Sequence, residues 1–205
     1  METDEKSTGW RGSREGWLAA AREAFVESGL DAVKIQPLAA KLGLSRTSFY
    51  WFFADRSELL DALLAEWEET NTRSLIRATE DYAGSIAEAV LNLLSVFFPN
   101  GAFEPRLDLA VRGWALQSDD VAALINTADE ARLDAIRRMF ERFGFAAPEA
   151  DVRARTIYLV QIGYISMQVT EATDLRLSRL PDYIKTYTGT AATAQELARF
   201  AARVR

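Results

Sequence analysis

The chain of 205 residues contains no cysteine and no histidine. These absences exclude disulfide bonds, thiolate and imidazole catalysis and most zinc sites, because all of them need a sulfur or an imidazole group. Carboxylates are the hard ligands that remain, and no metal or cofactor is expected. A glycine-rich phosphate loop is also missing, and the carboxylates look like solvated helix faces. The sequence therefore favours a protein that is not an enzyme.

Apolar runs of membrane-spanning length are absent too, and the acidic N-terminus lacks the pattern of a signal peptide. We therefore expect a cytoplasmic protein. Residues 1–9, METDEKSTG, are polar and show no periodicity, which predicts a flexible leader.

Hydrophobic residues make up 49% of the chain and charged residues 26%, which is an ordinary globular composition. Alternation of period two is sustained nowhere, whereas apolar residues recur at helical spacing in most segments. The sequence predicts an all-α fold, with a small head at residues 10–57 and a larger helical body at residues 58–205.

The net charge of −6 is unevenly distributed along the chain. Residues 9–57 carry seven basic side chains against five acidic ones, and residues 61–205 carry 16 Lys and Arg against 21 Asp and Glu. A basic head on an acidic body suits a protein that touches DNA at one end only. A chance fluctuation of a few charges is the alternative.

Residues 33–60, VKIQPLAAKLGLSRTSFYWFFADRSELL, have the pattern of a helix-turn-helix. Leu38 and Leu42 recur at helical spacing, and Gly43 follows at a position that favours a positive φ. Ser45 has the place of an N-cap, where its hydroxyl accepts from a backbone N–H two or three residues later.

Further helix signals surround this pair. Phe49 and Phe53 are four residues apart, so they share one face of the second helix. Asp55, with Glu58 three residues later, resembles a capping box at the start of a third helix. Apolar residues also repeat at helical spacing from Arg14 onward, which predicts a first helix that packs across the back of the pair.

The remaining residues of the second helix suit a reader of the DNA major groove. Arg46 and Thr47 lie in its first turn, which reaches base edges in helix-turn-helix docking, and Arg suits bidentate contact with guanine. Ser48, Tyr50 and Arg56 offer hydrogen bonds to phosphates. The alternative is an ordinary helical pair, in which the aromatic residues belong to the core.

The segment LAAKLGLSRTSFYWFFADRSELLDALL resembles the DNA-binding domain of TetR-like transcriptional regulators, and the resemblance covers about residues 14–65 closely. The motif residues are Ala39, Gly43, Phe49, Tyr50 and Phe53. Two positions depart from the family pattern: Lys34 stands where a capping Thr or Ser is common, and Phe52 stands where a His is common.

The resemblance implies a role for individual residues of the pair. Tyr50 is expected to contact phosphate, Trp51 to face the groove, and Gln36 to touch a base. The complete set expected to bind DNA is Lys34, Gln36, Arg46, Thr47, Ser48, Tyr50, Trp51 and Arg56.

The body is expected to consist of successive helices around a cavity for a small apolar or aromatic effector. Aromatic residues supply its walls and glutamines its polar groups. The expected ligand-binding residues are Trp67, Phe97, Phe98, Trp114, Gln117, Tyr158, Gln161 and Tyr164. Each aromatic residue also fits a plain core position.

Two helices are expected to form a homodimer. The helix at residues 149–171 is apolar over much of its circumference and must be covered on both sides. With a last helix at residues 192–204 it would build an intersubunit four-helix bundle, as the resemblance implies. Residues 175–189 are expected to be irregular or a short helix, because Pro181 and Gly189 interrupt them.

The resulting hypothesis is a bacterial, homodimeric, ligand-responsive repressor that binds a palindromic operator in double-stranded DNA and is released by its effector. The alternative is an all-helical binding or scaffolding protein whose head does not bind DNA.

Overall fold

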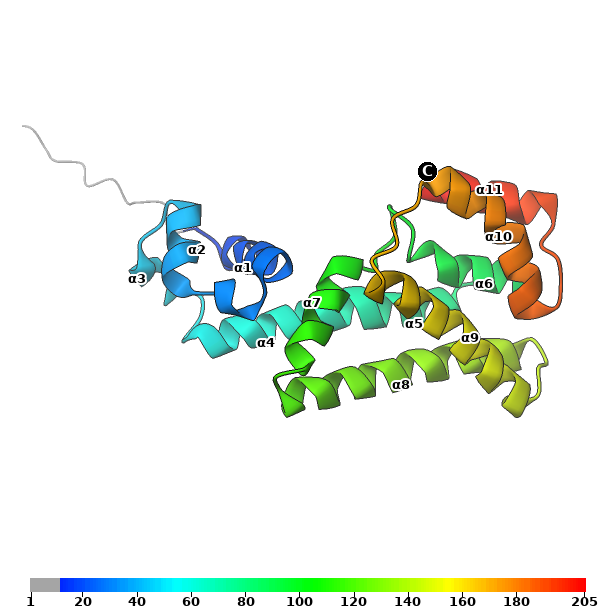
Figure 1. Cartoon of the computed structure of the whole chain (residues 1–205), viewed down its shortest axis with the longest axis horizontal. Helices are drawn as coiled ribbons and strands as arrows, with labels where there is room; N and C mark the ends of the chain where they lie inside the picture. The colour runs from blue at the N-terminus through cyan, green and yellow to red at the C-terminus, as the bar shows by residue number, and fades with distance from the viewer. Residues whose placement is uncertain (1–11) are drawn as a thin grey trace, which may run out of the picture. The chain divides into compact units, whose positions relative to one another are not determined.

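The computed structural model describes residues 12–205, and every regular element in that range is a helix. The all-α prediction is thereby confirmed. The chain divides into two compact units, the first ending at Glu66 and the second running from Trp67 to Arg205 (Figure 1). The predicted leader and Arg11 lie outside the described residues. The functional division after residue 57 stays a prediction.

The first unit contains four helices and one short 3₁₀ segment among its described residues. Their bounds are α1 Arg14–Ser28, η1 Leu30–Ala32, α2 Ile35–Leu42, α3 Arg46–Phe49 and α4 Arg56–Trp67. The Ser13 hydroxyl caps α1 by accepting from the Gly16 N–H at 3.0 Å, and Gly29, with φ of 80°, ends it. The predicted first helix is confirmed.

Aromatic rings fill the core of the first unit. Trp17 lies edge-on to Phe49 with ring centroids 5.3 Å apart, and Phe49 stacks on Phe53 at 5.4 Å. These three residues, with Phe25 and Leu38, are almost completely buried. Such pairs stabilise a fold by about 0.5–1.5 kcal/mol beyond the burial of their area, so this small unit has a well-defined core.

The second unit is built from helices throughout. Their bounds are η2 Glu68–Arg73, α5 Ser74–Glu80, α6 Ile86–Ser95, α7 Pro105–Ala115, α8 Asp119–Arg142, α9 Ala147–Ser166, α10 Thr173–Thr188 and α11 Ala194–Val204. The six residues of η2 have π-helical geometry. Side-chain hydroxyls cap three of these helices: Ser85 caps α6, Ser118 caps α8 and Thr193 caps α11.

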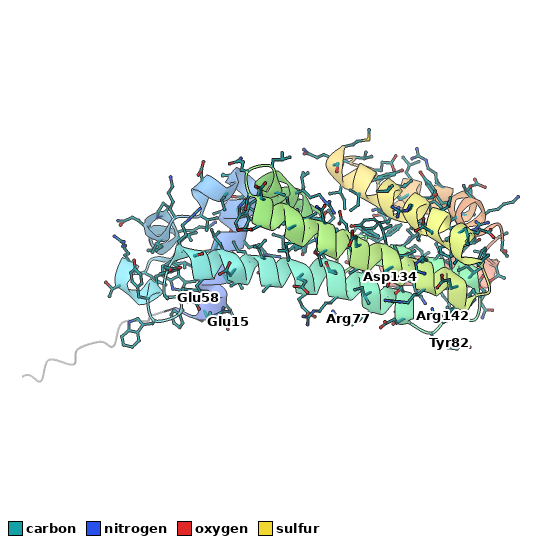
Figure 2. All side chains as sticks on the ribbon, turned by 90° about the horizontal axis from the view of Figure 1, so that it is seen from below. Glu15, Glu58, Arg77, Tyr82, Asp134 and Arg142 are labelled. Carbon is teal, nitrogen blue, oxygen red and sulfur yellow. The ribbon has the colours of Figure 1, made fainter. Side chains whose placement is uncertain are left out.

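The main core of this unit lies between α6 and its neighbours. α10 and α11 pack on α6, and α8 packs along α9 (Figure 1). Charged side chains take the outer faces, as Figure 2 shows for Arg77 of α5 and Asp134 of α8. None of the helices in residues 12–205 has the length and apolar character to cross a membrane.

Two predictions about the end of the chain are wrong. The helix predicted to reach residue 171 ends at Ser166, and Gln168 adopts a φ of 52° in the loop that follows. Residues 175–189 are neither irregular nor a separate short helix, because they belong to the 16-residue helix α10, which runs through Pro181. Its buried residues Leu180 and Ile184, followed by Tyr187, recur at helical spacing, and this apolar stripe outweighs the hydrogen bond that proline removes.

Candidate functional sites

The corner of the helix-turn-helix forms as predicted. Gly43 adopts the left-handed conformation, with φ of 66° and ψ of 28°, directly after α2. The Leu44 N–H donates to the Ala39 carbonyl at 2.9 Å, which satisfies a carbonyl at the end of α2. The Ser45 hydroxyl accepts from the Ser48 N–H at 3.3 Å and caps α3. The local signals of the sequence therefore specify this turn.

The third helix of the head also starts where predicted. The Asp55 carboxylate accepts from the Glu58 N–H at 3.0 Å, and the Glu58 carboxylate accepts from the Ala54 N–H at 2.6 Å. The reciprocal bond thus reaches one residue further back than in a standard capping box. By contrast, Lys34 precedes α2 without a side-chain cap.

Most residues expected to bind DNA are exposed on the first unit. On and beside α3, Trp51 is 65% exposed and Tyr50 is 48% exposed. Arg46 donates from Nη2 to the Tyr50 hydroxyl at 3.3 Å, a pairing of residues four apart. The other exposed members of the set are Lys34, Gln36 and Thr47. Neither Lys34 nor Arg46 forms an ion pair with a described carboxylate, so both charges face solvent.

Ser48 and Arg56 are placed differently from the other members. Ser48 is 6% exposed, and its hydroxyl donates to the Ser45 carbonyl at 2.6 Å. Arg56 donates from Nε to the Val33 carbonyl at 2.5 Å and from Nη2 to the Leu30 carbonyl at 2.8 Å. These contacts satisfy backbone carbonyls between α1 and α2. The Ser48 hydroxyl is therefore engaged within the turn, its expected contact with phosphate stays a prediction, and Arg56 ties α4 to this turn.

Replacing Arg56 with Ala is expected to destabilise the first unit by about 1.5–3 kcal/mol, because two backbone carbonyls lose a charged donor. Thermal unfolding, followed by proteolysis within the head, measures this loss. Replacing Arg46 with Ala is the matched control and should leave stability unchanged, because Arg46 is exposed. Equal stability of the two variants would show that the Arg56 contacts do not contribute to the stability of the first unit.

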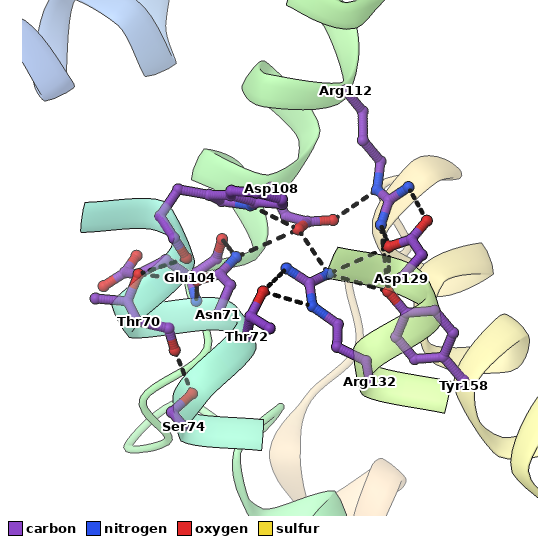
Figure 3. Close-up of polar contacts among 11 residues, drawn as sticks. Thr70, Asn71, Thr72, Ser74, Glu104, Asp108, Arg112, Asp129, Arg132 and Tyr158 are labelled. Carbon is purple, nitrogen blue, oxygen red and sulfur yellow. Dashed lines mark hydrogen bonds and ion pairs between the residues drawn. The ribbon is translucent and has the colours of Figure 1, made fainter. Parts of the chain in front are cut away.

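A buried network of charges occupies the second unit (Figure 3). Asp108 of α7 and Arg132 of α8 are both completely buried, and Arg132 Nη1 donates to Asp108 Oδ1 at 3.3 Å. Arg112 Nε donates to Asp108 Oδ2 at 2.7 Å, and its other two nitrogens bind both oxygens of Asp129 at 2.7 and 2.9 Å. Two carboxylates and two guanidinium groups thus form a neutral cluster.

Neutral groups complete the network on its two sides. The Trp67 indole donates to Asp108 at 2.9 Å, and Thr72 of η2 accepts two hydrogen bonds from Arg132, at 2.8 and 3.0 Å. The Tyr158 hydroxyl donates to Asp129 at 2.6 Å and accepts from Arg132 at 3.0 Å. The network therefore connects η2, α7, α8 and α9 with few free hydrogen-bonding positions.

The charges of the network hold the Asp108 carboxylate ionised. Burial by itself would raise the pKa of Asp108, but the guanidinium groups of Arg132 and Arg112 outweigh it and hold the pKa below its ordinary value. Burial raises the pKa of the Tyr158 hydroxyl, and the Asp129 carboxylate adds to this effect. Tyr158 therefore stays protonated and serves as a donor.

The expected ligand-binding residues do not form one site. Trp67 and Tyr158 are fully buried in the polar network, and Phe97 is buried against Phe103 with ring centroids 4.8 Å apart. Trp114 and Gln117 lie at the end of α7 and just beyond it. The structure therefore separates these five residues from the others in the predicted set.

The other three residues, Phe98, Gln161 and Tyr164, line a cavity of about 30 Å³. Its remaining walls come from α6, α10 and the loop before α10. They are Leu94, Glu171, Arg176, Arg179, Leu180, Tyr183 and Tyr187. This volume holds one water molecule.

Sequence reasoning missed both the network and most of the cavity. The carboxylates were interpreted as solvated helix faces, yet Asp108 and Arg132 are completely buried. One signal existed: Arg132 interrupts the apolar spacing of α8 between Ala128 and Ile136, all three of which are buried. A charge on an apolar stripe indicates a buried partner.

Comparison with known proteins bears on both units. Residues 18–63 match the profile of the family described as "Bacterial regulatory proteins, tetR family". The tetracycline repressor protein class G of Vibrio anguillarum is 36% identical over 76 residues, which cover 37% of this chain and 36% of that protein. The chain thus spans about a third of the length of these curated relatives, which include the tetracycline repressor protein class A of Escherichia coli.

Solved structures resemble the chain over nearly its whole length. Mycobacterium smegmatis AmtR superposes with a TM-score of 0.64 at 21% identity, with 98% of each chain covered. SmeT, the repressor of the Stenotrophomonas maltophilia multidrug efflux pump SmeDEF, gives a TM-score of 0.58 at 19% identity, with 90% of this chain and 93% of that chain covered. At these identities the likeness concerns the fold.

Proposed function

We propose that this chain, TetR-like in its head and in its fold, is a ligand-responsive DNA-binding transcriptional regulator. The observation that carries the proposal is the exposed surface of α3 behind a correctly formed turn. There Arg46 and Thr47 are available to base edges, and Tyr50 and Trp51 flank them. Lys34, directly before α2, and Gln36 within α2 add a charge and an amide to the same contact set.

We propose further that the regulator is a homodimer. A short helix reads few base pairs, and two heads on a two-fold axis read a palindrome. Along α9, Val152 is 62% exposed and Leu159 is 58% exposed, one heptad apart on the same face. Gly163 continues that face, and a Cβ there would meet nothing within 4 Å. Apolar exposure beside a small residue favours close packing of a second helix.

The expected share of the last helix in the dimer is not supported. Phe200 and Val204 of α11 are buried within the same unit, where α11 packs on α6, and the Ser85 hydroxyl donates to Glu196 at 2.5 Å. Exposed apolar residues instead continue beyond α9, at Met167, Val169 and Leu175. We therefore assign the dimer surface to α9, the loop after it and the start of α10.

Effector binding in the body would favour a spacing of the two heads that does not match successive major grooves. Such coupling is typically about 1–3 kcal/mol. α9 offers a physical route, since it supplies Tyr158 to the polar network and Gln161, one turn later, to the cavity. Release of the operator by the effector would make the protein a repressor.

Selection of bound sequences from a random DNA pool at two salt concentrations tests the proposal, with the mass of the protein in solution measured in parallel. Enrichment of a palindrome by a dimer is expected. A second candidate function, a helical binding protein without DNA-binding activity, is favoured by the net charge of −6 and by Phe52 at a position where the family pattern has His. No enrichment at either salt concentration would support that candidate.

Replacing Arg46 with Ala is expected to weaken operator binding by about 1–3 kcal/mol and to relax the base preference at one position of each half-site, because a bidentate donor is lost. Binding curves on the selected operator and on single-base variants measure both effects. Lys41 is the matched control, since it carries the same charge in the same unit and pairs with Glu23 at 2.7 Å. If its replacement with Ala relaxes base preference and that of Arg46 does not, the assigned reading surface is incorrect.

A further inference from the structure

The cavity between α6, α9 and α10 contains two polar atoms without a hydrogen-bond partner. One is Oε2 of Glu171, which is buried although Oε1 of the same carboxylate accepts from Arg179 at 2.6 Å. The other is the hydroxyl of Tyr187, a residue that is 3% exposed; the Gln161 side chain lies near this hydroxyl without forming a hydrogen bond of good geometry. A buried polar atom without a hydrogen bond is unfavourable, so both atoms favour a molecule that supplies the missing hydrogen bonds.

The charges around the cavity restrict what that molecule can be. Arg179 and Arg176 both line it, and the Arg176 guanidinium lies 4.2 Å from the centre of the Phe98 ring. An ammonium group would meet two cations, and a carboxylate would be placed beside the free oxygen of Glu171. That oxygen is an acceptor only, so its partner must be a donor. A neutral hydroxyl satisfies all of these conditions.

The walls of the cavity suit an aromatic ring. Tyr183 stacks on Tyr187 with ring centroids 5.5 Å apart, and the Tyr183 hydroxyl is hydrogen-bonded to the Tyr164 hydroxyl at 3.2 Å. Leu94 and Leu180 provide aliphatic surface beside them. Flat rings pack on such surfaces in offset or edge-on arrangements.

The size of the cavity matches a hydroxyl group. About 30 Å³ is room for one water-sized group. Tyr164, Glu171, Arg176 and Tyr183 are only half-buried, so they frame an opening at the surface of the subunit, beside the loop and helix start assigned to the proposed dimer. A ring would lie at this opening with its hydroxyl inside.

We propose that the effector of this regulator is a neutral phenol, whose hydroxyl donates to Glu171 Oε2 and accepts from the Tyr187 hydroxyl while its ring packs at the tyrosine-lined opening. That this phenol acts as an effector rests on the proposed function. The chemical class itself rests on the cavity.

Calorimetric titration of the full chain with phenol, benzoate and benzylamine tests the class, since the three probes share a ring and differ in charge. Phenol is expected to bind at least tenfold more tightly than either of the others. Glu171→Gln and Tyr187→Phe should each weaken phenol binding about tenfold or more, because the first replaces the charged acceptor by a neutral amide and the second removes the donor hydroxyl. Asp182→Asn is the matched control: Asp182 is an exposed carboxylate of α10 outside the cavity, so phenol affinity should not change.

Tyr187→Phe also distinguishes the loss of a ligand contact from a loss of folding. It keeps the ring and removes a buried hydroxyl that forms no hydrogen bond of good geometry, so its melting temperature without ligand should equal or exceed that of the parent chain. A raised or unchanged melting temperature together with weaker phenol binding supports the proposal. Unchanged phenol affinity in this variant would contradict it.

Three other results would overturn the inference. Tightest binding of benzylamine would mean that the Glu171 charge dominates, and tightest binding of benzoate would mean that the arginines do. Absence of binding by all three probes would mean that a water molecule alone occupies the cavity.

A separate assay distinguishes this inference from the regulator proposal. Operator binding by a chain that does not bind phenol would overturn the inference and leave the regulator standing. Phenol binding that leaves operator affinity unchanged would support the chemical class and contradict the ligand-responsive mechanism.

Discussion

Replacing Asp108 with Ala is expected to lower the free energy of unfolding of the second unit by about 3–5 kcal/mol, which is the usual result of removing one partner from a buried ion pair. The carboxylate accepts from Arg132, Arg112 and the Trp67 indole, and without it Arg132 Nη1 would keep only the longer ion pair to Asp129 Oδ1, at 3.5 Å. Arg132 is completely buried, so water cannot replace the lost acceptor.

Denaturant unfolding monitored by Trp fluorescence measures this loss. Asp134→Ala is the matched control, because Asp134 is also an aspartate paired with arginines, Arg137 and Arg138, but at the surface of α8. It should leave stability unchanged within error. Similar losses in the two variants would mean that the network contributes no more than surface pairs do.

A double variant separates two contributions to the free energy of unfolding: the stabilisation by the ion pair and the cost of one buried charge without its partner. Replacing Asp108 with Leu and Arg132 with Met together should lower the free energy of unfolding by less than the sum of the two single replacements. Each single replacement leaves the other charge buried without its partner, and the double replacement does not. Additive losses would indicate that the two groups act independently.

The same carboxylate predicts a dependence on acid. Its folded pKa lies below the unfolded value, so its contribution to stability is present above that unfolded value, about 3.9, and is lost as the pH falls through the folded pKa. Below about pH 4 the parent chain should therefore lose stability more steeply than an Asp108→Asn variant.

Replacing Leu159 with Asp is expected to weaken the homodimer about a thousandfold. The substitution places a charge on the proposed interface in both subunits, and truncation of one central interface residue commonly costs about 2 kcal/mol or more. Two copies then give about 4 kcal/mol. Palindrome binding should fall with it, because a monomer contacts only one half-site.

Sedimentation velocity over a range of protein concentrations measures the dimer directly. Leu116→Asp is the control, since Leu116 is 88% exposed after α7 and lies outside the proposed interface. It should leave the dimer intact. A dimer that survives Leu159→Asp and dissociates on Leu116→Asp would place the interface on another face of the body.

The head was predictable from the sequence because its signals are local. Gly43 has the positive φ that its position predicted, Ser45 and Asp55 accept the predicted backbone N–H groups, and Phe49 and Phe53 enter the core together. Each of these features depends on residues within four positions along the chain. The helix-turn-helix therefore follows from composition and spacing alone, and so does the all-α class.

The roles of charged residues in the body depended on tertiary structure. Asp108 and Arg112 are four residues apart, as are Asp151 and Arg155 on α9. Sequence spacing does not distinguish these pairs, yet only the first contains a completely buried group. Its burial comes from distant segments: Arg132 meets Thr72 across 60 residues.

The polar groups of the cavity also depended on tertiary structure. Glu171 and Tyr187 are ordinary residues in the sequence, and their free polar atoms arise only where α6, α9 and α10 meet. Helix α10 itself forms across Pro181 because the core covers its apolar stripe. The sequence alone thus determined the local backbone of the head and the side chains that it is proposed to present to DNA. Tertiary structure decided which charges and hydroxyls are removed from water, because burial depends on residues far apart in the chain.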